Sequence, residues 1–153
     1  MIDYDALLDQ CAVLLQDESA TNDVLLTKIC ALLKKEVNHY DWVGFYFAEH
    51  ATKTLHLKAF AGTPTDHTVI PFGKGICGQV AESNQTFLVE DVAAQDNYIA
   101  CDLHVKSEIV VPLFVEKMNV GQIDIDSNTI NAFSPKDAAF LEELNALIAH
   151  TLF

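Results

Sequence analysis

The chain has 153 residues, 50% of them hydrophobic, and it carries 22 acidic side chains against 9 basic ones, for a formal net charge of −13. This length and apolar content fit a folded domain with one core and exclude a disordered or collagen-like chain. All nine basic residues are lysine. The net charge repels phosphate backbones and anionic membranes, and arginine clamps for phosphate are missing, so neither nucleic acid nor a membrane is expected as a partner.

No targeting segment is visible in the sequence. The N-terminal residues lack the basic start and the apolar run of a signal peptide, and no stretch approaches the roughly 20 apolar residues of a membrane helix. We therefore expect a cytoplasmic protein. In that reducing compartment the four cysteines are not expected to form a disulfide framework, and the absence of a CxxC pair argues against a structural zinc site.

Apolar residues recur at helical spacing toward both ends of the chain, which predicts helices there. The first run covers residues 4–15, the second begins near residue 22, and the last covers residues 140–148. The segment 134–137, Ser-Pro-Lys-Asp, supplies a capping serine, a proline at the first helical position and an acid three residues after the cap. Cys11 and Cys30 lie within the first two apolar stripes, so we interpret them as core residues.

The middle of the chain predicts short strands, because β-branched and aromatic runs alternate with turn residues. A short helix is predicted over residues 76–82, after a glycine-rich loop. Residues 91–107 are polar and irregular, which predicts an exposed connection. The expected strands cover residues 40–47, 54–60, 68–71, 86–90, 108–115 and 119–126.

These elements predict one α+β domain over residues 1–153. A central, mostly antiparallel sheet is expected, with the N- and C-terminal helices packed on one face. No internal repeat, low-complexity tract or linker interrupts the chain.

Three acids are candidates for a common site. Asp124 and Asp126 alternate with isoleucines along one predicted strand, so both carboxylates point to the same face. Glu108 begins the strand expected to pair with it. If they converge, the carboxylates suit a ligand ammonium group, and their mutual repulsion raises the pKa of one of them, which makes a proton donor. The alternative is a solvated edge face that carries acids only for solubility.

Aromatic residues flank a glycine on the first predicted strand. Trp42, Gly44 and Tyr46 share one face, and the glycine is expected to leave a recess between the two rings. An aromatic recess beside carboxylates suits a small cationic or sulfur-bearing ligand. The commoner role of such aromatics is packing in the core.

The other two cysteines lack an obvious packing role. Cys77 falls in the first turn of the predicted short helix, where the helix N-terminus is expected to lower the thiol pKa. Cys101 lies in the polar connection. Together they are candidates for a redox pair, although the spacing alone does not establish that the sulfurs come within disulfide distance.

Five segments in this order and spacing resemble the free methionine-(R)-sulfoxide reductase family, whose members are stand-alone GAF-domain enzymes. The resemblance runs from about residue 41 to the end of the chain, and the two leading helices also fit a GAF domain. The segments are Asp41–Tyr46, Ile70–Gly78, Ile99–Asp102, Ser107–Pro112 and Ile123–Ser127.

The resemblance implies a thiol chemistry with no bound cofactor. Cys101 stands at the position of the family's attacking cysteine, which releases methionine and becomes a sulfenic acid. Cys77 stands at a resolving position and is expected to form the disulfide that a dithiol protein such as thioredoxin reduces. The family also leads us to expect a homodimer.

The resemblance also implies how the substrate, free methionine-(R)-sulfoxide, is held. Trp42 and Tyr46 match residues that enclose the methyl-sulfoxide end. The carboxylates that bind the amine and assist protonation of the sulfoxide oxygen correspond to Glu108, Asp124 and Asp126.

The sequence departs from the family at one point. Many members carry a third cysteine about ten residues before the position of Cys77, whereas the loop over residues 62–68 has none. Either Cys77 is the only resolving residue, or an external thiol reduces Cys101 directly.

Two other functions remain open at the level of the sequence. One is a GAF sensor that binds a small ligand without chemistry, and the other is a structural or dimerising GAF module. The acidic composition and the missing arginine disfavour a sensor for phosphate-bearing ligands, and a structural module requires neither the acids nor the cysteine pair.

Overall fold

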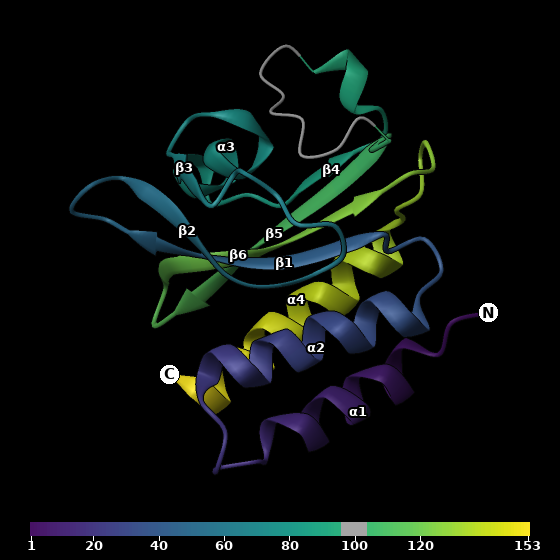
Figure 1. Ribbon diagram of the computed structural model, residues 1–153, viewed down its shortest axis with the longest axis vertical. Helices are drawn as coiled ribbons and strands as arrows, with labels where there is room; N and C mark the ends of the chain where they lie inside the picture. The colour runs from purple at the N-terminus through teal and green to yellow at the C-terminus, as the bar shows by residue number, and fades with distance from the viewer. Residues whose placement is uncertain (96–103) are drawn as a thin grey trace.

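The computed structural model describes residues 1–95 and 104–153 (Figure 1). Each predicted helix and strand within them is present, with ends shifted by a few residues. The elements in chain order are α1 (Tyr4–Leu15), α2 (Asn22–Glu36), β1 (Trp42–Glu49), β2 (Thr54–Ala61), β3 (Val69–Pro71), α3 (Gly75–Ser83), β4 (Phe87–Val89), a 3₁₀ turn (Val92–Ala94), β5 (Ser107–Val115), β6 (Met118–Ser127) and α4 (Pro135–Leu152).

The strands form one six-stranded sheet in the order β3-β2-β1-β6-β5-β4. Every neighbouring pair is antiparallel, which confirms the predicted sheet type. The strand that follows the long N-terminal helices, β1, therefore lies at the centre beside β6. This arrangement places residues from the first and last thirds of the chain next to one another.

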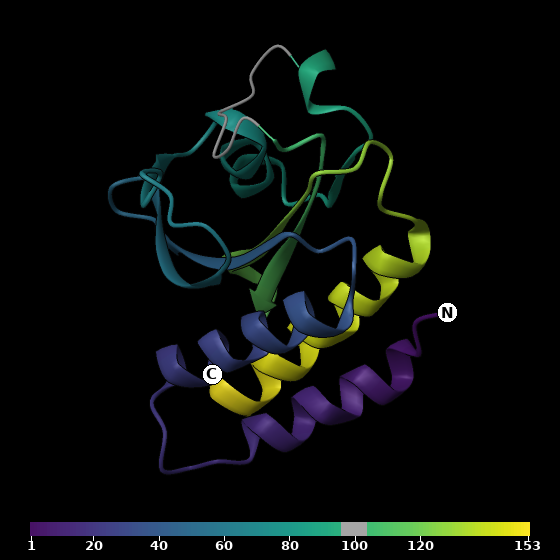
Figure 2. The same ribbon diagram turned by 45° about the vertical axis from the view of Figure 1, so that its right-hand side comes forward.

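Helices cover the two faces of the sheet unequally (Figures 1 and 2). The long helices α2 and α4 pack on one face, and α1 packs outside them, against both. On the other face the short helix α3 contacts β5, β6, β2 and β3. The prediction that the N- and C-terminal helices share one face is confirmed.

The main core lies between the sheet and the long helices. Val43, Phe45, Ile123 and Ile125 point toward the helices and are fully buried. These residues alternate with side chains that point toward α3, as the period of two in a strand requires. The core also includes Cys11 and Cys30, each 0% exposed, which confirms their interpretation as core residues.

The predicted capping box of α4 is present and extends into a wider network. Asp137 Oδ2 accepts a hydrogen bond from the Ser134 amide at 2.8 Å. Its Oδ1 lies 2.6 Å from the hydroxyl of Tyr4, 2.7 Å from that of Tyr40 and 3.0 Å from His39 Nε2. Burial opposes ionisation, but these donors outweigh it and hold the pKa of Asp137 below its ordinary value. One carboxylate thus ties α1, α4 and the segment before β1 together.

The hairpin that joins β5 to β6 closes over two residues only. Glu116 and Lys117 both have positive φ, 51° and 70°, which is the geometry of a tight hairpin turn. Met118, expected in the turn, is the first residue of β6 instead. No glycine or asparagine marks this turn, so its length was not evident from the sequence.

No helix in the described part of the chain is long and apolar enough to cross a membrane.

Candidate active site

The three predicted acids meet on the face of the sheet that α3 covers. Trp42 of β1 pairs with Asp126 of β6, which pairs in turn with Glu108 of β5. In the next row Gly44 lies opposite Asp124. Because alternate residues of a strand share a face, this register places all three carboxylates on the same side of the sheet.

These carboxylates are buried, so a solvated edge face is excluded. Their exposed fractions are 4% for Glu108, 1% for Asp124 and 2% for Asp126. Strands β5 and β6 lie inside the sheet, with a neighbour on each side. Acids in such a position reduce stability unless a ligand, a proton or another polar group compensates them.

Cys77 brings a thiol to the same group. Helix α3 begins at Gly75, whose φ of +63° is readily adopted only by glycine, and Cys77 is the third residue of the helix. The thiol Sγ lies 4.0 Å from Glu108 Oε2. One polar atom each of Cys77, Glu108 and Asp124 lies within 4.8 Å of the other two. The side chain of Cys77 is 5% exposed.

Asp124 is the least compensated member of the group. Neither of its carboxylate oxygens has a partner at hydrogen-bond distance among the described residues. Burial raises its pKa, and interactions with Glu108 and Cys77 offset that only in part. The predicted direction of the carboxyl pKa shift is right, but its cause is burial rather than repulsion between the acids, since the interaction with Glu108 lowers the pKa of Asp124. A raised pKa is the property that a carboxyl proton donor needs.

The prediction that the pKa of the Cys77 thiol is lowered is wrong. Burial raises its pKa well above the ordinary value, and the neighbouring charges of Asp124, Glu108 and Asp126 raise it further. The helix N-terminus does favour a thiolate, but its effect is smaller than that of desolvation together with three carboxylates. Cys77 is therefore a protonated thiol near neutral pH.

Trp42 itself occupies the space above Gly44. A side-chain carbon on this glycine would overlap the six-membered part of the indole, so the predicted open recess is filled by the ring. The indole also stacks on Phe60, with 5.9 Å between ring centroids, and its Nε1 donates to the Thr63 carbonyl at 3.0 Å. Trp42 is thus a fixed wall beside Asp126.

Tyr46 fixes the other end of the loop that contains Thr63. Its hydroxyl donates to the carbonyl of His67 at 2.8 Å. The two aromatic residues therefore hold the segment from Thr63 to His67, in which the family's third cysteine is missing, against the sheet. The predicted pair does lie on the face of the acids, as expected from the strand period.

Cys101 lies outside the described residues, so its predicted role remains a prediction. The described cysteines are all free thiols. Burial raises the pKa of Cys11 to about 12, which makes it unreactive, and the pKa of the fully buried Cys30 is also raised.

Gln122 was not predicted as part of the site. It lies on the same strand face as Asp124, two residues away, between Tyr46 and Pro112 of the neighbouring strands. It is 0% exposed, and neither atom of its amide has a hydrogen-bond partner among the described residues. The strand period could have identified it, because it has the same parity as the two aspartates.

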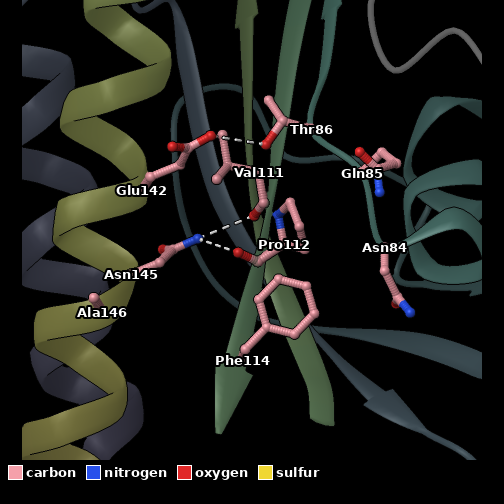
Figure 3. A pocket seen from close by; sticks show the side chains of 9 residues that line it. All are labelled: Asn84, Gln85, Thr86, Val111, Pro112, Phe114, Glu142, Asn145 and Ala146. Atoms are coloured by element: carbon pink, nitrogen blue, oxygen red, sulfur yellow. Dashed lines mark hydrogen bonds between the residues drawn. The ribbon is translucent and has the colours of Figure 1, made fainter. Parts of the chain in front are cut away.

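A cavity of about 460 Å³ lies between α4 and the part of β5 that extends beyond its pairing with β4 (Figure 3). Asn145 donates through Nδ2 to the carbonyls of Val111 and Pro112, both at 3.0 Å. Of the residues that line this cavity, only Glu142 is ionisable. It has no thiol and no group of acids, so the chemistry of the predicted site lies on the other face of the sheet.

Known proteins share this fold and are similar to this chain in sequence. Residues 19–152 match the GAF domain family. The free methionine-R-sulfoxide reductase of Escherichia coli is 38% identical over 127 residues, which cover 83% of this chain and 75% of that protein. The chain belongs to the free methionine-R-sulfoxide reductase family.

Solved structures of this reductase family agree with the fold. The enzyme from Neisseria meningitidis in complex with its substrate is 36% identical, with a TM-score of 0.91 over 97% of this chain and 87% of that one. The reduced form of fRMsr from Staphylococcus aureus is also 36% identical, with a TM-score of 0.91 over 100% and 97% of the two chains. Reductase-family membership confirms the predicted GAF fold and makes the protein an enzyme rather than a sensor or a structural module.

Proposed function

We propose that this protein reduces free methionine-(R)-sulfoxide to methionine. The observation that carries the proposal is the group of buried carboxylates beside the Cys77 thiol, on the face bounded by Trp42 and Tyr46. Membership of the reductase family supports the same reaction. The ammonium group of a zwitterionic amino acid supplies the positive charge that compensates these buried carboxylates.

The substrate ammonium group is held by Glu108, Asp124 and Asp126. A peptide-bound methionine sulfoxide carries a neutral amide in that place and leaves the buried carboxylates uncompensated, which costs binding energy. The acids thereby select the free amino acid. Trp42 is held rigidly by the Thr63 carbonyl and provides an apolar wall for the methyl-sulfoxide end.

Cys101 attacks the sulfoxide sulfur as a thiolate. The sulfoxide oxygen is protonated by a carboxyl group of the site, for which Asp124 has the raised pKa. Oxygen passes to the cysteine, so methionine leaves and Cys101 becomes a sulfenic acid. The substrate sulfur gains two electrons and the cysteine sulfur loses two.

Cys77 then resolves the sulfenic acid. Its thiol points at Glu108 Oε2 from 4.0 Å, so this carboxylate accepts the proton as the sulfur attacks. A disulfide forms between Cys77 and Cys101, and the sulfenic oxygen leaves as water. An external dithiol of the thioredoxin type reduces the disulfide and is itself oxidised. No bound cofactor takes part.

The route of recycling is tested by mass spectrometry of the protein after a single turnover without reductant. A Cys77–Cys101 disulfide is expected. A lasting Cys101 sulfenic acid beside a free Cys77 thiol, with no disulfide between them, would instead show that an external thiol reduces Cys101 directly.

The reaction itself is tested by an assay on the separate R and S forms of free methionine sulfoxide, with dithiothreitol or thioredoxin as reductant. Only the R form should be consumed, and Cys101→Ser should reduce the rate to background. Cys30→Ser, which alters a core thiol, serves as the control and should retain activity per folded molecule. Consumption of the S form alone, or of neither form, would overturn the proposal.

A further inference from the structure

The group formed by Cys77, Glu108 and Asp124 also has the composition of a metal site. The three residues come from α3, β5 and β6, and their polar atoms lie within 4.8 Å of one another. Both oxygens of Asp124, which is 1% exposed, lack a partner at hydrogen-bond distance within the described residues. A buried carboxylate in this condition requires a proton or a cation.

The space between these side chains is small. It measures about 10 Å³, which is roughly the room that one water molecule needs. A single metal ion therefore fits among the described residues without displacing an element of the fold. Lys74, a basic residue that also lines this space, is exposed to solvent.

The distances are close to those of a coordinated ion. Zinc binds thiolate sulfur at about 2.3 Å and carboxylate oxygen at about 2.0–2.2 Å, so a tetrahedral site holds sulfur and oxygen about 3.5 Å apart. Cys77 Sγ and Glu108 Oε2 are 4.0 Å apart. All three ligand atoms lie within 4.8 Å of one another, so each pair needs to approach by no more than about 1.3 Å to reach the spacing around one ion.

We propose that Cys77, Glu108 and Asp124 bind one Zn²⁺ ion or a similar thiophilic divalent cation. One sulfur and two oxygen ligands suit zinc, whereas Mg²⁺ and Ca²⁺ prefer six or more oxygen ligands. Three protein ligands leave a fourth position for water. The bonds from the metal to the Cys77 sulfur and to an Asp124 oxygen replace bonds to hydrogen, so the thiol proton and any proton on the Asp124 carboxyl pass to solvent and no oxidation state changes.

The ion would act as an inhibitor of the proposed reaction. It occupies the carboxylates that the substrate amine needs and blocks the sulfur that resolves the sulfenic acid. This consequence rests on the proposed function, whereas metal binding itself does not.

Cobalt provides the test, because Co²⁺ bound to a thiolate gives a near-ultraviolet charge-transfer band that Co²⁺ bound to oxygen ligands lacks. The reduced, full-length protein should develop this band with one equivalent of Co²⁺, and Zn²⁺ should abolish it. Cys77→Ser should lose the band, and Asp124→Asn should weaken cobalt binding by about 10-fold or more. Cys101→Ser and Cys30→Ser, the matched thiol controls, should keep it.

The proposal is overturned if the band survives in Cys77→Ser or disappears in Cys101→Ser. A second measurement uses the unaltered protein and so does not depend on a variant's folding. Zn²⁺ should slow alkylation of Cys77, followed by mass spectrometry of the Cys77 peptide, by about 10-fold or more. An unchanged rate at Cys77 would also overturn it. Neither measurement uses sulfoxide, so failure here is separate from failure of the reductase assay.

Discussion

The two faces of the sheet are built from the same strands yet have opposite roles. On β6, Ile123 and Ile125 point into the apolar layer beneath α2 and α4, while Asp124 and Asp126 point toward α3. All four side chains are at most 2% exposed. Burial therefore stabilises the protein on one face and costs stability on the other, where we propose that the acids bind the substrate and donate a proton.

The largest effect is expected for Asp124→Asn, because it removes the carboxyl group that we propose as the proton donor and nearly preserves the shape of the side chain. We expect kcat/KM for free methionine-(R)-sulfoxide to fall by about 10²–10⁴-fold. The raised pKa of Asp124 means that its ionised form destabilises the folded state once the pH exceeds the ordinary carboxyl range. The melting temperature at pH 7 should therefore rise, as thermal unfolding can measure.

A fall in both activity and melting temperature would mean instead that Asp124 is structural. In that case the contrast between the two faces would not hold.

The matched change on the other face is Ile125→Ala, one residue along the same strand. This side chain is 0% exposed within the main core. Its truncation should lower the free energy of unfolding by about 2–5 kcal/mol, as measured in urea, because it leaves a cavity. Activity per folded molecule should stay within about twofold. A specific loss of activity with unchanged stability would contradict the assignment of this face.

The face of the sheet that α2 and α4 cover has a buried acid of its own, Asp137. Both of its carboxylate oxygens accept hydrogen bonds. We expect Asp137→Asn to lose about 1.5–3 kcal/mol at pH 7. The lowered pKa of Asp137 stabilises the fold above the ordinary carboxyl pKa and ceases to do so as the pH falls through the lowered value. The difference from the unaltered protein should thus shrink at acid pH, in urea titrations at pH 7 and near pH 3.

The control for this change is Asp9→Asn, on the exposed side of α1. It should alter stability by less than about 0.5 kcal/mol at either pH. An Asp137→Asn deficit that does not depend on pH would show that packing, rather than charge, is what Asp137 contributes.

The smallest effect is expected at the edge of β5, where Asn145 binds two carbonyls (Figure 3). Asn145→Ala leaves both without this donor and should cost about 1–2 kcal/mol, with kcat/KM unchanged, because the acids lie on the other face. Glu143→Ala, exposed on the same helix, is the control. A loss of activity without a loss of stability would connect the two faces and weaken the comparison.

The sequence predicts much of this contrast, because period two in a strand is enough to separate Asp124 from Ile125. It also places Glu108 beside the aspartates, since a hairpin pairs neighbouring strands. The sign of the Cys77 pKa could not be predicted, because it depends on how closely acids from two other elements approach the thiol. The indole above Gly44 was missed for a similar reason, since a side chain's rotamer is set by its neighbours in space.

The network at Asp137 was predicted only in its local part. The capping box follows from the spacing to Ser134, whereas Tyr4 and Tyr40 reach the carboxylate from 133 and 97 residues away in the sequence. Cys101 was predicted from a sequence motif and the family resemblance, and it lies outside the described residues.

The two-residue turn at Glu116 and Lys117 bears on the order in which the chain folds. It makes the pairing of Glu108 with Asp126 local in sequence, and local contacts tend to form before distant ones. We expect the β5–β6 hairpin to bring the acids together while water still screens their charges. Trp42 and Cys77 then cover them from distant parts of the chain. The electrostatic cost of burying the acids is therefore incurred late in folding.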